Sequence, residues 1–233
     1  MSALQDGDIS TEQGTIRWSS NYTFLVDVVH DGLTFPAVYK PQGGERPLWD
    51  FPDGTLCFRE RAAFLTSEAL GWRLVPPTVL RDGSRGLGSV QFFIDHDPEH
   101  HYFTFDASFK PQLMKLALFD AVINNADRKG GHCIADADNR LWGIDHGIAF
   151  NAQNKLRTVI WNFAGQPIAA DDLRDLAALC EKLDAPDDPY TGQMSQLING
   201  AEMLSLKRRI RLLIDSACYP SPGPGPNYPW PPV

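Results

Sequence analysis

The sequence contains no run of apolar residues that approaches the roughly 18 needed for a membrane-spanning helix. Its first ten residues are polar and acidic, without the basic and apolar regions of a secretory signal. Cysteine is scarce: there are four residues and no Cys-x-x-Cys pair, which argues against a thiolate zinc site. We therefore expect a cytoplasmic protein with reduced thiols and no integral membrane contact.

Basic residues are also few relative to acidic ones. Lysine and arginine total 21 against 29 aspartates and glutamates, which gives a formal net charge of -8. An acidic chain is poorly suited to nucleic acid, so we expect no nucleic-acid partner. With 233 residues, of which 43% are hydrophobic, the chain can bury a core, and wholesale disorder is excluded.

The first half of the chain predicts mainly β structure. Apolar alternation and turn signals predict strands over residues 14–18, 22–29, 33–40, 74–80 and 89–94. His30-Asp31-Gly32 supplies a hairpin turn, and a second turn is expected at Asp82-Gly83. A loop rich in proline and glycine over 41–54 precedes a predicted helix over 55–70.

The second half predicts mainly helices. Residues 111–124 are apolar on nearly all sides, so this helix should be buried, and residues 170–218 are also predicted helical. A hairpin is expected over 132–144. The segment 219–233 contains seven prolines and is predicted to be extended and mobile.

This order of elements suggests an α+β fold of two lobes, like that of protein kinases. We assign residues 1–94 to a β-rich N-terminal lobe and residues 95–218 to a helical C-terminal lobe. Residues 219–233 form a Pro-rich tail. The active site is expected in the cleft between the lobes.

Two acidic residues, Asp127 and Asp145, lie on either side of the predicted hairpin. A hairpin of this length returns the second carboxylate close to the first. Phosphoryl transfer uses such a pair, since one carboxylate orients the attacking hydroxyl and the other holds Mg²⁺ against the nucleotide phosphates. The pair therefore indicates phosphoryl transfer.

The motifs around these acids resemble known kinases. Asp127-Arg128 with His132, followed by Ile144-Asp145-His146-Gly147, is similar to the catalytic and metal-binding loops of phosphatidylinositol 3-/4-kinases. Residues 35–41 and 59–77 resemble the nucleotide-binding lysine strand, helix glutamate and following strand of HipA-type serine/threonine kinases. Most of the chain also resembles a mainly actinobacterial family with distant phosphoinositide-kinase similarity.

The resemblance implies nucleotide-binding roles for Ser19, Ser20, Asn21, Lys40, Glu60 and Gln91. Lys40 would contact the α- and β-phosphates, and Glu60 would pair with Lys40. The turn over 19–21 would cover the phosphates with hydroxyl and N–H donors. The strand over 90–93, which contains Gln91, would lead into the hinge against adenine.

The resemblance also implies the chemical roles. Asp127 would orient or deprotonate the acceptor hydroxyl, and Asp145 would bind Mg²⁺. Arg128 either contacts the substrate or supports the loop. His132 stands where phosphoinositide kinases carry an asparagine metal ligand. It would bind Mn²⁺, hydrogen-bond a phosphate, or mark lost activity.

The resulting hypothesis is a phosphotransferase that uses ATP with Mg²⁺ or Mn²⁺ and acts on a hydroxyl of an unidentified protein, inositol or small molecule. One alternative is a pseudokinase-like nucleotide-binding module without transfer activity. Another is an adenylyltransferase on the same fold. A third is a metallohydrolase that would use Asp127, His132, Asp145 and His146.

Overall fold

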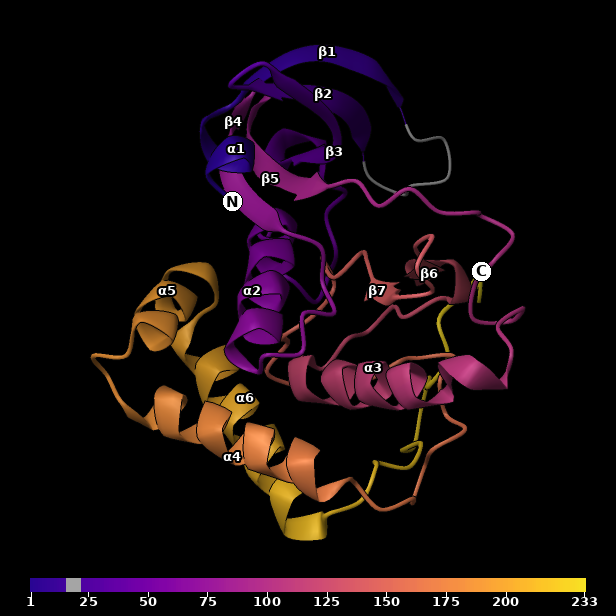
Figure 1. The fold of residues 1–233 in the computed structure, drawn as a ribbon. Helices are drawn as coiled ribbons and strands as arrows, with labels where there is room; N and C mark the ends of the chain where they lie inside the picture. Colours follow the sequence, from indigo (N-terminus) through magenta and orange to yellow (C-terminus); the bar gives the residue numbers. More distant parts are fainter. Residues whose placement is uncertain (16–21) are drawn as a thin grey trace.

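Alternating apolar residues build the N-terminal lobe, which is drawn at the top of Figure 1. The computed structural model describes residues 1–15 and 22–233. Within that part of the chain, five antiparallel strands form a sheet in the order β1-β2-β3-β5-β4. Their bounds are β1 (Asp8–Thr15), β2 (Phe24–His30), β3 (Leu33–Pro41), β4 (Thr78–Gly83) and β5 (Gly86–Phe92).

The hairpin between β2 and β3 confirms the predicted turn. Asp31 and Gly32 both have positive φ, 50° and 75°, as the central pair of a type I′ hairpin requires. The resulting register places Phe24 opposite Tyr39. Every second side chain of β2 is buried, and these side chains pack with Leu4 of the short helix α1 (Ser2–Asp6).

Helix α2 (Leu56–Ala69) stands between the sheet and the helices of the C-terminal lobe (Figure 1). It matches the helix predicted over 55–70. After α2 the chain turns at Gly71 and runs without regular structure to β4. The hydroxyl of Ser67 accepts the backbone N–H of Leu74 at 2.7 Å and so fixes this exit.

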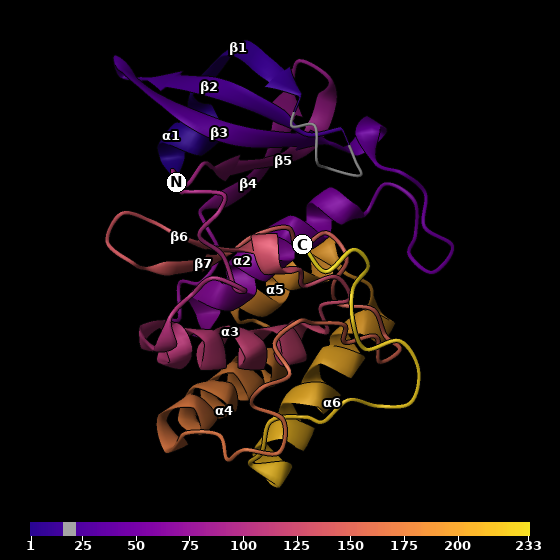
Figure 2. The ribbon, with the colours of Figure 1, turned by 90° about the vertical axis from the view of Figure 1, so that its right-hand side faces the viewer.

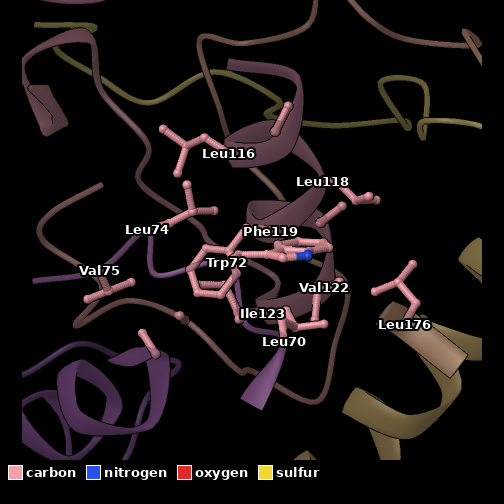
Figure 3. Packing of buried hydrophobic residues seen from close by; sticks show 14 of the residues in the cluster. Leu70, Trp72, Leu74, Val75, Leu116, Leu118, Phe119, Val122, Ile123 and Leu176 are labelled. Atoms are coloured by element: carbon pink, nitrogen blue, oxygen red, sulfur yellow. The ribbon is translucent and has the colours of Figure 1, made fainter. Parts of the chain in front are cut away.

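Helix α3 (Lys110–Ile123) is the centre of the C-terminal lobe, as its apolar sequence predicts. Figure 3 shows Leu116, Phe119, Val122 and Ile123 of α3 in the same buried hydrophobic cluster as Trp72. The remaining helices and strands of this lobe are β6 (Cys133–Ala135), β7 (Leu141–Gly143), α4 (Ala170–Asp184), α5 (Pro189–Leu197) and α6 (Gly200–Ser216). Three short 3-10 helices cover Gln42–Gly44, Ala107–Phe109 and Gly130–His132. None of the described helices is long and apolar enough to cross a membrane.

The boundaries of several predicted strands were wrong. The strand predicted over 74–80 begins only at Thr78, because the two prolines before it cannot donate ladder hydrogen bonds. The turn that joins β4 to β5 lies at Ser84-Arg85 rather than at Asp82-Gly83. The first strand begins at Asp8 rather than at residue 14, and residues 16–18 of the predicted strand lie outside the described residues.

The Pro-rich tail is extended, as predicted, but it lies against the C-terminal lobe. The carbonyl of Asn227 accepts hydrogen bonds from the N–H of Thr158 at 3.1 Å and the indole N–H of Trp161 at 2.9 Å. The carbonyl of Pro232 accepts the N–H of Gly130 at 2.8 Å. Figure 2 shows this segment rising from the lower end of α6 to the level where the lobes meet. The prediction of a mobile tail was therefore wrong, because the tail is docked on the C-terminal lobe.

Removal of residues 227–233 should lower the free energy of unfolding by about 1–3 kcal/mol, because three donors lose their protein acceptors. Urea denaturation measures this change. Leu204→Ala alters an exposed side chain of α6 and serves as the control. An unchanged denaturation midpoint in the truncated protein would show that the tail contributes nothing to stability.

Candidate active site

Lys40, near the end of β3, lies in a cleft between the two lobes. Its ammonium group forms ion pairs with Glu60 of α2 and, at 2.8 Å, with Oδ1 of Asp145. Burial alone would lower the pKa of Lys40, but the charges of Asp145 and Glu60 outweigh burial and hold this pKa above its ordinary value. The lysine is thus a fixed positive charge. The residues that line the cleft are Tyr22, Thr23, Lys40, Pro41, Glu45, Leu56, Cys57, Glu60, Asp127, Asp145, Gly147 and Ile148.

Glu60 connects Lys40 to the loop that follows β7. One of its carboxylate oxygens contacts Lys40, and the other accepts the backbone N–H of His146 at 3.0 Å. The side chain is only 3% exposed, so both of these contacts are shielded from water. The structure therefore brings Lys40, Glu60 and Asp145 together, although they are far apart in the sequence.

Asp145 is the accessible carboxylate of this group, with 44% of its side chain exposed. Partial burial favours the neutral acid, but the charge of Lys40 holds the pKa of Asp145 well below its usual range. Its backbone has a φ of 58°, in the left-handed region, which Asp adopts more readily than most residues. The carboxylate is thus ionised and open to the cleft.

Asp127 lies on the same cleft, in the loop that follows α3. Asn124 ends α3 with a φ of 56°, and the side chain of Asn125 accepts the N–H of Asp127 at 3.0 Å. Burial raises the pKa of Asp127 to about 6, and the nearby charge of Asp145 adds to the shift, although Lys129 opposes it. This carboxylate can therefore accept a proton near neutral pH.

His132 lies between the two acids. Its Nδ1 is 3.0 Å from the carbonyl oxygen of Asp127, and its Nε2 is 3.3 Å from Oδ2 of Asp145. The backbone N–H of Lys129, which can only donate, also lies 3.4 Å from Nδ1, whereas the carbonyl of Asp127 can only accept, so the two contacts of Nδ1 favour opposite tautomers. Burial lowers the pKa of His132 to about 4, so the ring is neutral.

Arg128 supports the loop and does not face the cleft. Its fully buried guanidinium donates to both carboxylate oxygens of Asp120, at 2.9 and 3.0 Å. It also donates to the carbonyls of His132 and Ile144, at 3.0 and 2.8 Å. These contacts favour the supporting role over substrate contact, so Arg128 is a positioning residue rather than a catalytic one.

His146 is also occupied by this buried network. Its Nε2 lies 2.6 Å from Nη2 of Arg128 and must accept the guanidinium proton. Its Nδ1 is buried without a partner among the described residues. Because Nε2 accepts from Arg128, the proton of the neutral ring lies on Nδ1. Neither nitrogen then has a free lone pair, which argues against the metal-ligand role that the metallohydrolase alternative requires.

Other predicted site residues lie elsewhere. The side-chain amide of Gln91 donates to the hydroxyl of Thr78 at 2.8 Å and is buried in the sheet, so it does not line the cleft. Ser19, Ser20 and Asn21 lie outside the described residues.

Sequence reasoning missed two acidic residues near the site. Asp120 is the buried counter-ion of Arg128. The sequence pattern that could have identified it is a single acidic residue in the otherwise apolar second half of α3. Glu45 accepts the N–H groups of Leu56 and Cys57, at 3.0 and 2.8 Å, and so caps the start of α2 beside the cleft. Nothing in the local pattern of the loop over 41–54 distinguished Glu45.

No family model matches the sequence. The chain is 38% identical to protein Rv2133c of Mycobacterium tuberculosis, over 98% of this chain and 93% of that protein. It belongs to the same family.

The fold of this Rv2133c family member is similar to that of one solved kinase. A crystal structure of the Helicobacter pylori proinflammatory kinase CtkA superposes with a TM-score of 0.53. The match covers 92% of this chain and 95% of that chain, at 13% sequence identity. The predicted α+β kinase-like fold is thus confirmed at this level.

Replacement of Arg128 by Met should lower the free energy of unfolding by about 3–5 kcal/mol, because the buried carboxylate of Asp120 loses its counter-ion and keeps only the side-chain amide of Asn125 as a donor. Chemical denaturation followed by circular dichroism measures the loss. Arg211→Met cuts an exposed ion pair with Asp184 and should cost less than about 1 kcal/mol. Equal costs for the two variants would contradict the supporting role of Arg128.

Proposed function

We propose that this protein is a phosphotransferase that uses ATP and a divalent metal ion and acts on a hydroxyl acceptor. The observation that carries the proposal is the ammonium of Lys40, held between Glu60 and Asp145 in a cleft that also contains Asp127. Phosphoryl transfer depends mostly on positioning and charge neutralisation, and this group supplies both. The kinase fold is consistent with it.

Lys40 would bind the α- and β-phosphates of the nucleotide. Glu60 keeps the ammonium in place through an ion pair that is almost fully buried. The backbone after β5 would face adenine. Gln91 contributes to this hinge through its strand rather than through its side chain, which is bonded to Thr78.

A divalent cation would be held beside Asp145. Nε2 of His132 and Oδ2 of Asp145 lie 3.3 Å apart, so one cation would contact both when Nε2 presents its lone pair. The proton of His132 would then lie on Nδ1, which faces the carbonyl of Asp127. No group of three or more candidate ligand side chains occurs among residues 1–15 and 22–233, so phosphate oxygens and water would complete the coordination. When bound, the metal would neutralise charge on the phosphates.

Asp127 would accept the proton of the attacking hydroxyl. A general base works best when its pKa is near the operating pH, and burial places the pKa of Asp127 at about 6. Lys129, whose ammonium lies 3.6 Å from Asp127, would stabilise the transferred group. The acceptor would be a hydroxyl of a protein, inositol or small molecule, as in the phosphoinositide 3-/4-kinase-like and HipA-like enzymes.

The first test is ATP binding by calorimetry with Mg²⁺ or Mn²⁺, followed by transfer of labelled phosphate. Asp145→Asn should weaken metal-dependent binding about tenfold or more, because it removes a metal ligand and a partner of Lys40. Asp127→Asn should retain binding and lose about 10²- to 10⁴-fold in the rate of phosphoryl transfer.

The rate of phosphoryl transfer by the unchanged enzyme should rise with pH through about 6, since Asp127 must be ionised to act as base.

The outcomes of this test separate the alternatives. Absence of nucleotide binding with either metal would sink the proposal. Binding without transfer would indicate a pseudokinase-like module. The mass of a modified acceptor would distinguish a phosphoryl group from an adenylyl group.

With His132 as a metal ligand, we expect the enzyme to prefer Mn²⁺ to Mg²⁺, because imidazole nitrogen suits transition metals better than Mg²⁺. His132→Asn should shift the ratio of the Mn²⁺-supported rate to the Mg²⁺-supported rate toward Mg²⁺ by about tenfold. Parallel rate measurements with each metal give this ratio. His30→Asn, in the β2–β3 region outside the cleft, is the control. A ratio that stays constant in His132→Asn would remove His132 from the metal site.

A further inference from the structure

We infer that the buried ion pair between Arg59 and Glu202 is a positioning device that holds α2 in one orientation, so that the contact between Lys40 and Glu60 is permanently assembled. As a statement about catalysis, this inference rests on the proposed function. As a statement about geometry, it can be tested without ATP. The site would then be assembled at all times, and movement of α2 would not switch it on or off.

Arg59 is anchored by three contacts in the interior. Its Nη2 lies 2.6 Å from Oε1 of Glu202, and its Nη1 donates to the carbonyl of Ala149 at 2.7 Å. Its Nε donates to the hydroxyl of Thr55 at 3.3 Å. The side chain is 1% exposed. Arg59 therefore joins α2 to α6 and to the segment that follows Asp145.

Arg59 and Glu60 are neighbours on α2, and successive side chains of an α-helix point about 100° apart. One of these side chains reaches the C-terminal lobe while the other reaches Lys40. A helix fixed through Arg59 cannot rotate without moving Glu60. At the other end of α2, Thr66 meets the hydroxyl of Tyr190 from α5 at 3.0 Å, which adds a second attachment.

The partner carboxylate is itself fixed. Oε2 of Glu202 accepts the N–H of Asn199 at 2.9 Å, and the side chain of Asn199 accepts the N–H of Glu202 at 3.0 Å. This reciprocal capping box begins α6. Glu202 cannot follow a moving Arg59 without uncapping α6.

Stability alone does not account for this arrangement. A buried ion pair can often be replaced by apolar residues without loss of stability, because desolvation of the charges offsets their attraction. In protein kinases, movement of the corresponding helix makes or breaks the Lys–Glu pair and thereby controls activity. Here α2 is attached to α6, to the Asp145 segment and to α5, which leaves no free path for such a movement.

The test uses the double variant Arg59→Met/Glu202→Gln. It removes both charges but keeps a residue at position 202 that can cap α6. The readout is acylation of the Lys40 amine by a water-soluble ester, measured by mass spectrometry and normalised to the exposed Lys110. A paired ammonium reacts slowly, and Lys40 keeps its partner Asp145 in both the double variant and Glu60→Gln. We therefore expect a rise of a few-fold in the reactivity of Lys40 in the double variant, to the value of Glu60→Gln, while the melting temperature stays close to that of the unchanged protein.

The matched control is Asp172→Asn, which cuts an ion pair between α3 and α4 at 2.8 Å without touching α2. Its Lys40 should react at the original rate. A folded double variant with the original Lys40 reactivity would overturn the inference. If the double variant does not fold, Glu202→Gln alone is measured, and unchanged reactivity there overturns it equally. Because acylation needs neither ATP nor an acceptor, failure of phosphoryl transfer would reject the proposed function and leave this result standing.

Discussion

The positive charge of Lys40 is the constraint on which the rest of the site depends. Without it, the carboxylates of Glu60 and Asp145 would approach each other across the cleft with nothing to compensate their repulsion. The lysine comes from the sheet, Glu60 from α2, and Asp145 from the loop after β7. One ammonium group thus joins three elements of the fold and defines where the lobes meet.

The site divides into a rigid interior and an open face. The interior contains the guanidinium of Arg128, which bonds Asp120 and holds the carbonyls on either side of the β6–β7 hairpin. The open face presents the carboxylates of Asp127 and Asp145. The buried groups therefore fix the backbone, while the groups that would contact ligands keep access to solvent.

The sequence predicted those parts that depend on local patterns. The Asp31-Gly32 turn, the buried α3 and the short hairpin followed from turn chemistry and hydrophobic periodicity. Proximity of Asp127 to Asp145 followed from hairpin length. The ends of strands were harder to predict. Pro76 and Pro77 belong to an apolar run that looks like a strand, but β4 begins only after them.

Contacts between distant residues were beyond the reach of local patterns. Arg59 and Glu202 are 143 positions apart, and each looks like an ordinary surface charge in the sequence. The docking of the tail uses backbone carbonyls of Asn227 and Pro232, which no side-chain pattern reveals. The roles of Lys40 and Glu60 were expected from a family resemblance, whereas their support by α6 required the structure.

The docked tail also has a consequence for how the protein is made. Ribosomes synthesise chains from the N-terminus, and domains begin to fold during synthesis. Gly130 and Thr158 therefore emerge well before Asn227 and Pro232, the residues whose carbonyls they bond. The loop that carries Asp127 therefore reaches its final hydrogen-bonded state only after residues 227–232 have left the exit tunnel, about a hundred residues later in synthesis than the loop itself.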